Sequence, residues 1–297
     1  MKLLSADTDL MEFQGMQEQQ YIAPLSDYID EVKNRIANGP TQYGEKLPWK
    51  KTFDNVRLRP GEVSLWAGIN GHGKSLLLGQ VILWLPSDQQ SLIASLEMPP
   101  ASTIERMCRQ TLPSGIPTDK YIEEFTQATE HIWIYDQTDT VPVERMLAMV
   151  NYAAKQMGMN HIMIDSLVKC GIAPDDYNMQ KYFVDRLCWI AKTNNVHIHL
   201  VHHVRKGDKE GKTPDKFDVK GAGEITDLVD NVFIIHRNKD KERKVEANKP
   251  VDKLEPDTVI AVAKQRHGGW EGTIPLYFHK ASQQFMSAPD HPLRWTK

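Results

Sequence analysis

Cysteine is scarce in this chain of 297 residues, which contains only Cys108, Cys170 and Cys188. Three widely separated cysteines give neither a disulfide framework nor the close spacing of a zinc-binding motif. Long hydrophobic runs are also missing. No segment approaches the roughly 18 unbroken apolar residues of a membrane span, and the polar N-terminus lacks the apolar core of a signal peptide. We therefore expect no contact with membranes and a cytoplasmic location.

An excess of positive charge is absent as well, because the formal net charge at pH 7 is -3. This excludes a generally basic coat for nucleic acid, so any contact with DNA or RNA must come from a local basic patch. Hydrophobic residues make up 40% of the chain and charged residues 25%. These proportions are typical of a globular protein that buries a sizeable core.

The strongest functional signal is the segment 68–75, Gly-Ile-Asn-Gly-His-Gly-Lys-Ser, which has the spacing of a phosphate-binding loop. A short apolar run precedes it and a helical pattern at 76–83 follows it, which is the context that this motif needs. Backbone N–H groups of such a loop and the helix N-terminus bind phosphate oxygens, the Lys74 amine reaches the β- and γ-phosphates, and the Ser75 hydroxyl holds Mg²⁺. The residues expected to bind the nucleotide here are Gly68, Asn70, Gly71, His72, Gly73, Lys74, Ser75 and Leu76.

Beyond the loop, strand patterns alternate with helical patterns, which predicts a mostly parallel sheet with helices on both faces. The expected strands are 91–96, 131–135, 161–164, 196–201, 232–235, 258–263 and 273–279, and the expected helices are 101–111, 143–157, 182–192 and a short one at 224–230. His197 and His199 alternate with apolar residues in their strand and are expected to be structural. The strongly charged segment 237–253 is expected to be an exposed hairpin or a partly disordered loop.

Two further features carry a possible function. Asp165 follows a buried strand, where ATPases with a phosphate loop place the carboxylate that holds Mg²⁺, although an aspartate there can instead cap the following turn. The segment 205–220 has six cationic and four acidic side chains, hence a net charge of +2, with glycine, proline and no periodicity. It is expected to be a basic loop, for which composition alone suggests simple solvation.

The N-terminal part divides from the rest of the chain. Residues 1–23 are polar and suggest a flexible arm, and 24–55 contain an amphipathic helix at 25–37 followed by a linker. The ATPase domain is expected over 56–297. The apolar stripe of the helix, Leu25, Ile29, Val32 and Ile36, needs a partner, which could be its own domain or a neighbouring subunit.

In order along the chain, these motifs resemble those of the ring-shaped replicative DNA helicases of the RecA-like superfamily, namely bacterial DnaB, the helicase half of phage primase-helicases and mitochondrial Twinkle. The resemblance covers about residues 56–286 and includes Arg59-Pro60-Gly61-Glu62, the phosphate loop and Ser95-Leu96-Glu97-Met98-Pro99. It implies an α/β fold, a RecA-like P-loop ATPase with a mostly parallel, twisted central sheet behind an N-terminal linker helix. It also implies ATP or another NTP and Mg²⁺ as cofactors, with Asp165 as the Mg²⁺ aspartate.

The resemblance assigns further roles. Glu97 would be the general base that polarises the attacking water, and Arg106 looks like the arginine of the second motif, beside the nucleotide. His203 matches the switch that senses the γ-phosphate, which is histidine in phage and mitochondrial members. Lys264 and Arg266 look like the cationic fingers that reach the ATP site of the neighbouring subunit, where an arginine stabilises the transition-state charge; a surface arginine in a turn is the alternative.

The resemblance also implies single-stranded DNA inside a homo-hexameric ring, 5′ to 3′ movement, and a separate primase or replication loader as a partner. Its DNA-binding residues would be Arg205, Lys206, Lys209, Lys212, Lys220, Gly221 and Gly223. Two features depart from the phage type. Thr226 and Asp227 stand where arginine and glutamine are usual, and no primase or zinc-binding domain is recognisable, so the expectation is a minimal helicase from a phage, plasmid or prophage in a bacterial host.

Two other functions stay open at this level. A RecA-like DNA-binding ATPase that acts as a scaffold or recombination mediator without unwinding would carry the same phosphate loop and the same Glu97. A small-molecule P-loop kinase is a weaker alternative, because the basic loops and the fingers have no role in it.

Overall fold

The computed structural model describes residues 23–38, 43–112, 116–204 and 223–295. The chain divides into two units, residues 1–43 and 44–297, which are described separately. Within the described ranges, no helix has both the length and the apolar character needed to cross a bilayer.

The first unit contains a short amphipathic helical segment. A 3₁₀ turn, η3 (Leu25–Tyr28), leads into α1 (Ile29–Asn38), so the helix expected from residue 25 begins with a tighter turn. The apolar stripe is solvent-exposed, with Leu25 91% and Ile36 77% exposed. An apolar stripe of this size that contacts water is typical of a surface with a partner.

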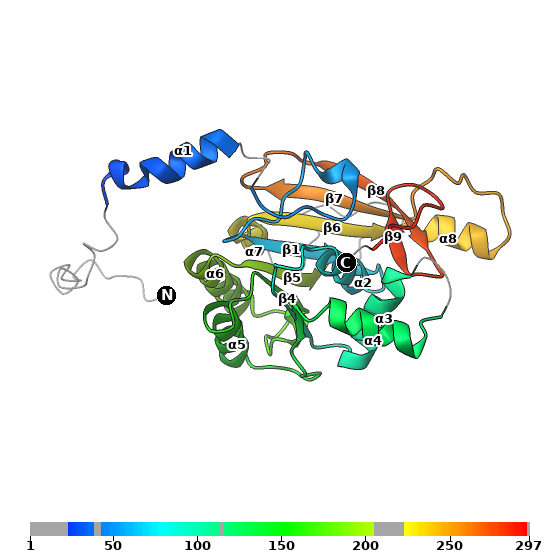
Figure 1. Cartoon of the computed structure of the whole chain (residues 1–297), viewed down its shortest axis with the longest axis horizontal. Coiled ribbons are helices and arrows are strands. Elements are labelled where there is room, and N and C mark those ends of the chain that lie inside the picture. The colour runs from blue at the N-terminus through cyan, green and yellow to red at the C-terminus, as the bar shows by residue number, and fades with distance from the viewer. Residues whose placement is uncertain (1–22, 39–42, 113–115, 205–222, 296–297) are drawn as a thin grey trace. The chain divides into compact units, whose positions relative to one another are not determined.

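The second unit is built on a nine-stranded sheet with the order β3-β2-β4-β5-β1-β6-β7-β8-β9 (Figure 1). Its first six strands in that order pair in parallel and the last three pair antiparallel. The mostly parallel sheet is therefore confirmed. The strands are β1 (Val63–Gly68), β2 (Ser91–Ser95), β3 (Ile132–Ile134), β4 (His161–Asp165), β5 (His197–His203), β6 (Asn231–Arg237), β7 (Thr258–Gln265), β8 (Gly272–His279) and β9 (Gln284–Met286).

Helices cover both faces of this sheet. The helices are α2 (Lys74–Leu83), α3 (Pro100–Thr111), α4 (Asp119–Ala128), α5 (Val143–Lys155), α6 (Tyr177–Asn194), α7 (Gly223–Leu228) and α8 (Lys239–Glu246), with 3₁₀ turns η4 (Lys50–Thr52) and η5 (Leu167–Lys169). One apolar core lies between the sheet and α5, α6 and α7, and the other between the sheet and α2, α3 and α4 (Figure 1). Strand side chains alternate between them, since Leu65 belongs to the first core and Trp66 to the second.

The expected loop at 237–253 is wrong, because α8 forms there. The Asn238 side chain accepts a hydrogen bond from the Lys241 N–H at 2.9 Å and caps the helix. Lys241 is buried and pairs with Asp257 at 2.8 Å. The charged composition of this segment concealed a helix that is fixed by a cap and an ion pair rather than by an apolar stripe. The helix α4 and the strand β9 were not predicted either.

The larger unit begins at Gly44, before the expected domain start at residue 56. The intervening residues pack into the core, with Leu47 and Trp49 at most 1% exposed. The indole N–H of Trp49 donates to the carbonyl of Phe285 at 2.8 Å. The segment 44–55 thus lies against the C-terminal hairpin of its own unit.

Three buried histidines lie close together on the neighbouring strands β4 and β5. His161, His197 and His199 are at most 2% exposed, and for His197 and His199 this burial agrees with the structural role expected from the sequence. His161 Nδ1 lies 3.1 Å from His199 Nε2, the His199 ring accepts the indole N–H of Trp66 at 3.2 Å, and His197 Nε2 lies 2.9 Å from the Ser64 hydroxyl. Burial lowers the pKa of all three, that of His197 to about 4.

We expect the free energy of unfolding to fall as the pH is lowered from about 7 to about 5. The unfolded chain takes up protons on these histidines below pH 6.5, whereas the folded chain does so only at lower pH. Their stabilisation is therefore complete above pH 6.5 and is lost below it, at up to about 1.4 kcal/mol per pH unit for each histidine. Burial also raises the pKa of Asp165 to about 6 and raises those of Glu45 and Glu62, which opposes this trend. The lowered pKa values of His72 and His236 add to the trend.

Urea unfolding across this pH range measures the effect. The variant His267→Gln, which removes an exposed histidine, should keep the same slope. A free energy of unfolding that stays constant over the range would contradict the account.

Candidate nucleotide-binding site

The predicted site residues lie where the parallel strands end. Gly68 ends β1, Asp165 ends β4 and His203 ends β5, while Glu97 follows β2 by two residues. Carboxyl ends of parallel strands meet at one edge of a sheet, where such folds bind ligands. The strand order places β2, β4, β5 and β1 side by side, so these positions converge.

Glu97, Asp165 and His203 line a cleft of about 530 Å³, whereas Gly68 is not part of its lining. This volume is within the range of small-molecule sites. The lining combines the phosphate loop, three neighbouring strand ends and the C-terminal hairpin. The lining residues are Asn70, Gly71, Gly73, Lys74, Ser75, Leu76, Glu97, Arg106, Asp165, His203, Arg237, Phe278, Lys280 and Gln283. Ten of the residues predicted from sequence are therefore brought together around one cavity.

The phosphate loop adopts a backbone and a packing that favour glycine. Gly73 has a φ of +82° where α2 begins, a conformation that glycine adopts without strain. A Cβ on Gly68 would lie 2.6 Å from the carbonyl oxygen of Ile235. The Lys74 amine donates to the carbonyls of Gly68 and Ile69 at 2.9 and 3.1 Å, and burial lowers its pKa to about 8. The amine thus lies within the loop that would surround the phosphates.

Glu97 contacts two neighbours at the edge of the cleft. The Ser166 hydroxyl donates to Glu97 Oε1 at 2.7 Å, and His203 Nε2 lies 3.9 Å from the same oxygen. The Glu97 side chain is 42% exposed and the His203 side chain 14% exposed. The carboxylate is therefore held at one oxygen while it remains accessible from the cleft.

Ser75 and Asp165 provide hard oxygen donors of the kind that Mg²⁺ takes. Asp165 is 3% exposed, and burial raises its pKa to about 6 against the opposing hydrogen bond from Ser75. A bound cation would stabilise the charged form of this carboxylate. No group of three or more His, Cys, Asp or Glu side chains in the described part of the chain is arranged to hold a metal ion. A Mg²⁺ held by two protein oxygens and by phosphates fits these residues.

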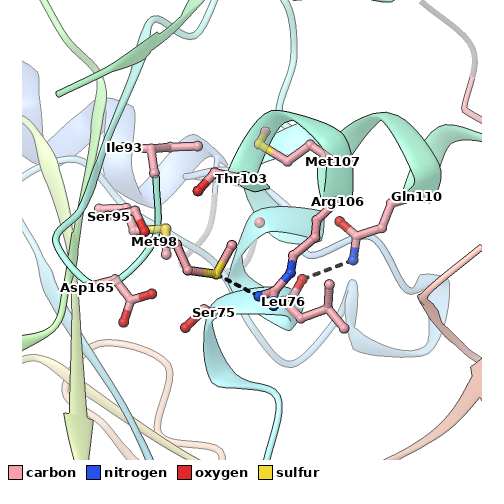
Figure 2. A pocket seen from close by; sticks show the side chains of 12 residues that line it. Ser75, Leu76, Ile93, Ser95, Met98, Thr103, Arg106, Met107, Gln110 and Asp165 are labelled. Carbon is pink, nitrogen blue, oxygen red and sulfur yellow. Dashed lines mark hydrogen bonds between the residues drawn. The ribbon is translucent and has the colours of Figure 1, made fainter. Parts of the chain in front are cut away.

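Arg106 reaches toward the site from α3. Figure 2 shows its side chain extended toward Ser75, with the guanidinium bonded to the sulfur of Met98, while Asp165 lies on the opposite side of Ser75. The distance from Arg106 Nη1 to Met98 Sδ is 2.7 Å. Because thioether sulfur is a weak acceptor, phosphate oxygens can replace it readily.

Other predicted residues lie elsewhere. The His72 ring accepts the backbone N–H of Arg237 at 3.0 Å and packs edge-on against His236, so its side chain is outside the cleft lining. Lys264 and Arg266 contact α7 in the same subunit. The predicted DNA-binding residues 205–221 lie outside the described residues, and Gly223 begins α7.

Several residues at the cleft were not predicted from the sequence. Ser166 follows Asp165 directly, so its proximity to Glu97 depends on β2 and β4 being neighbours. Arg237 ends the parallel strand β6, a position at the carboxyl edge that could have signalled it. Lys280 and Gln283 come from the antiparallel hairpin β8–β9, whose return over the phosphate loop has no local signal. Phe278, in the same hairpin, is one of three neighbours, with Tyr277 and His279, that the resemblance places near the nucleobase while leaving open which of them stacks on it.

Comparison with known proteins identifies the family to which the sequence is similar. The family model described as "DnaB-like helicase C terminal domain" matches residues 52–287. A DNA helicase/primase of Enterobacteria phage T3 is 26% identical over 126 residues, which is 40% of this chain and 22% of that protein. The chloroplastic/mitochondrial Twinkle homolog of Arabidopsis thaliana is 20% identical over 276 residues, covering 84% of this chain and 37% of that protein. The chain therefore spans well under half the length of these relatives.

Solved structures show the same fold. The ATPase domain of G40P superposes with a TM-score of 0.75 at 16% identity, covering 89% of this chain and 99% of that one. A DnaB-like replicative helicase, studied with its primase interactions, has a TM-score of 0.70 at 16% identity, and the match covers 91% of this chain and 69% of that one. The RecA-like α/β fold is thereby confirmed. Because the family model spans most of the sequence, the chain belongs to the DnaB-like helicase C-terminal domain family.

Proposed function

We propose that the protein is an ATP-driven DNA helicase that works as a homo-hexameric ring and moves along single-stranded DNA in replication. The observation that carries this is the contact of Glu97 with Ser166 and His203 at the edge of a phosphate-loop cleft. A carboxylate held there can orient a water toward the γ-phosphate, and the histidine beside it can respond to that phosphate. The family supports helicase activity.

ATP or another NTP and Mg²⁺ are the proposed cofactors. Lys74 would bind the β- and γ-phosphates, and Arg106 would exchange its sulfur contact for a phosphate oxygen. Ser75 and Asp165 would hold Mg²⁺, which supplies charge neutralisation on the phosphates. Glu97 would take the proton from the attacking water.

Phe278 is the proposed contact for the nucleobase. It lines the cleft with Arg237, whereas the neighbouring Tyr277 donates its hydroxyl to the carbonyl of Leu254 at 2.9 Å and lies under the Lys241 amine. His279 bonds to the Ser282 hydroxyl at 2.7 Å. Of the three adjacent rings, the phenyl ring is the one that faces the site.

We expect Phe278→Ala to raise the KM for ATP about 10-fold, since stacking of a base on an aromatic ring contributes about 1–3 kcal/mol. The kcat should change little, because the base is remote from the transferred phosphoryl group. Steady-state kinetics measure both values, and Tyr277→Phe serves as a control that should keep the wild-type KM. A kcat loss without a change in KM would contradict the assignment.

Ring assembly is proposed to use the N-terminal helix and the cationic fingers. The exposed stripe of α1 and η3 would dock on the neighbouring subunit, and Arg266 and Lys264 would complete the ATP site of that neighbour. A flexible arm at 1–23, a linker segment at 24–55 and an ATPase domain at 56–297 remain the proposed division, with residues 44–55 of the linker packed against the ATPase domain.

We expect the double variant Val32→Asp with Ile36→Asp to be monomeric, because it places two charges on an apolar contact. The control is Asp30→Ala with Lys33→Ala, which removes the exposed ion pair on this helix. The mass of the oligomer, measured for both variants at equal protein concentration, distinguishes a monomer from a ring. Rings of unchanged size in the aspartate variant would reject the docking role of α1.

Single-stranded DNA is the proposed track, bound by Arg205, Lys206, Lys209, Lys212, Lys220, Gly221 and Gly223. Movement is proposed to be 5′ to 3′, with a separate primase or replication loader as a partner, in the cytoplasm of a bacterial host. Contacts to phosphates are independent of sequence and weaken with salt.

DNA-stimulated hydrolysis tests the proposal. Single strands of unrelated sequence should stimulate hydrolysis equally, and their affinity should fall steeply as salt is raised. The double variant Lys209→Ala with Lys212→Ala should reduce the slope of log affinity against log salt concentration by about 2, since each phosphate contact contributes about 1 to that slope. A rate of ATP hydrolysis that does not change when single-stranded DNA is added would contradict the proposed helicase function.

A further inference from the structure

The two proposed finger cations are bound within their own subunit. The Lys264 amine lies 2.8 Å from the carbonyl oxygens of both Thr226 and Asp227. Arg266 Nη2 donates to the carbonyls of Asp227 and Leu228 at 3.0 and 3.1 Å. Both cations therefore contact the last turn of α7.

These carbonyl groups are available because they end a helix. The last carbonyls of an α-helix have no intrahelical donor. In α7 the Val229 N–H donates to the carbonyl of Ile225, the residue before Thr226, Asp227 and Leu228. The three carbonyls that follow accept all four hydrogen bonds from the cation pair. The side chains thus satisfy the end of the helix.

Asp230 anchors the arginine from the next position. Arg266 Nε lies 3.4 Å from Asp230 Oδ1, and the Arg266 backbone N–H donates to the Asp230 carbonyl at 2.9 Å. The Asp230 side chain is 2% exposed, and its other oxygen accepts the Val63 N–H at 2.9 Å. The carboxylate is therefore fixed at the start of β1.

Asp227 contributes a negative charge from the exposed side of α7. Burial and the nearby Arg266 lower the pKa of Lys264, and the carboxylates of Asp227 and Asp230 oppose this lowering. The Asp227 carboxylate therefore attracts Lys264, whose amine also donates to the Asp227 backbone carbonyl. Asp227 is also one of the two residues that depart from the phage-type pattern.

We propose that the C-terminal turn of α7 is a dock that holds Lys264 and Arg266 in their own subunit, and that Asp227 is a positioning residue that sets how often the pair is released. The proposal rests on the proposed trans role of these cations. While the carbonyls of α7 hold the two side chains against their own subunit, neither side chain can extend to the γ-phosphoryl oxygens of the neighbour. The rate of hydrolysis then scales with the released fraction.

Hydrolysis kinetics without DNA test this dock. Asp227→Asn keeps the shape of the side chain and removes its charge, so kcat should rise about two- to fivefold, the factor that attraction between exposed opposite charges contributes. The KM for ATP should stay unchanged, because the fingers act on the transition state. Glu224→Gln is the matched control: it removes the other acidic charge of α7, which pairs with Lys181 at 3.7 Å, and should keep the wild-type kcat.

The same substitution in a background that carries both Lys264→Ala and Arg266→Ala completes the cycle. Asp227→Asn should then have no effect on kcat, because the dock has lost both fingers it regulates. An unchanged or lowered kcat in Asp227→Asn, or a gain that persists in the Lys264→Ala and Arg266→Ala background, would overturn the dock alone. If Arg266→Ala by itself left hydrolysis unchanged in rings of normal mass, the proposed trans finger would fail as well.

Discussion

Replacing Glu97 with glutamine is expected to lower the rate of ATP hydrolysis about 10²- to 10⁴-fold, the factor that a positioned general base contributes. The amide keeps the shape and the hydrogen bond from the Ser166 hydroxyl, 2.7 Å away in the wild type, but it cannot take a proton from water. ATP binding should persist because Lys74 and the loop are untouched. Phosphate release and nucleotide affinity, measured on the same samples, separate the two effects.

Glu124→Gln is the control for this substitution. Glu124 is an exposed residue of α4 that pairs with Lys120 at 3.7 Å, so its loss should leave hydrolysis at the wild-type rate. Wild-type hydrolysis by Glu97→Gln would show that another group activates the water. A parallel loss of ATP binding would show that Glu97 contributes to the fold of the cleft instead.

A mixture of two inactive variants is expected to regain hydrolysis. Arg266→Ala should lower the rate about 10³- to 10⁵-fold, as the loss of an arginine finger does, and Lys74→Ala should abolish phosphate binding. In rings assembled from both, an Arg266→Ala subunit offers an intact phosphate loop to the intact finger of a Lys74→Ala neighbour. About a quarter of the contacts in a random ring are then complete, since each head-to-tail contact joins two different faces.

The assay compares hydrolysis by each variant alone with hydrolysis by rings assembled from equal amounts. A mixture no more active than its components would contradict a site shared between subunits, because a finger acting in its own subunit cannot complement. The variants should have wild-type ring mass, so that any loss is catalytic.

The phosphate loop could be predicted from the sequence because its information is local. Eight consecutive residues, the strand before and the helix after them are enough to place Lys74 and Ser75, and the structure has β1 and α2 at those positions. Strand ends are similarly local, so Asp165 was located correctly at the end of β4.

The remaining parts of the cleft depend on pairing between distant segments. Phe278 and Gln283 reach the loop only because β8 and β9 return antiparallel beside it, and Phe285 is fixed there by Gln80, which donates to its carbonyl at 2.9 Å and accepts its N–H at 2.7 Å. No periodicity encodes those bonds. The helix α8 was missed for a related reason, since its cap at Asn238 and the ion pair of Lys241 with Asp257 replace the apolar stripe on which helix prediction depends.

The positions of Lys264 and Arg266 show a different limit. The sequence indicates two cations near a turn, and the resemblance implies that they serve a neighbouring subunit. Their bonds to the carbonyls of α7 could not be foreseen, because free carbonyls at a helix end are visible only once the helix and β7 lie side by side.

Strand separation on a forked DNA duplex tests the central claim most directly. Wild-type protein with ATP and Mg²⁺ should release the strand that the ring excludes, whereas Glu97→Gln should bind the fork and release nothing. Wild-type protein that hydrolyses ATP in the presence of DNA yet separates no fork, whichever strand carries the tail, would contradict the helicase function and favour a DNA-binding ATPase that acts as a scaffold.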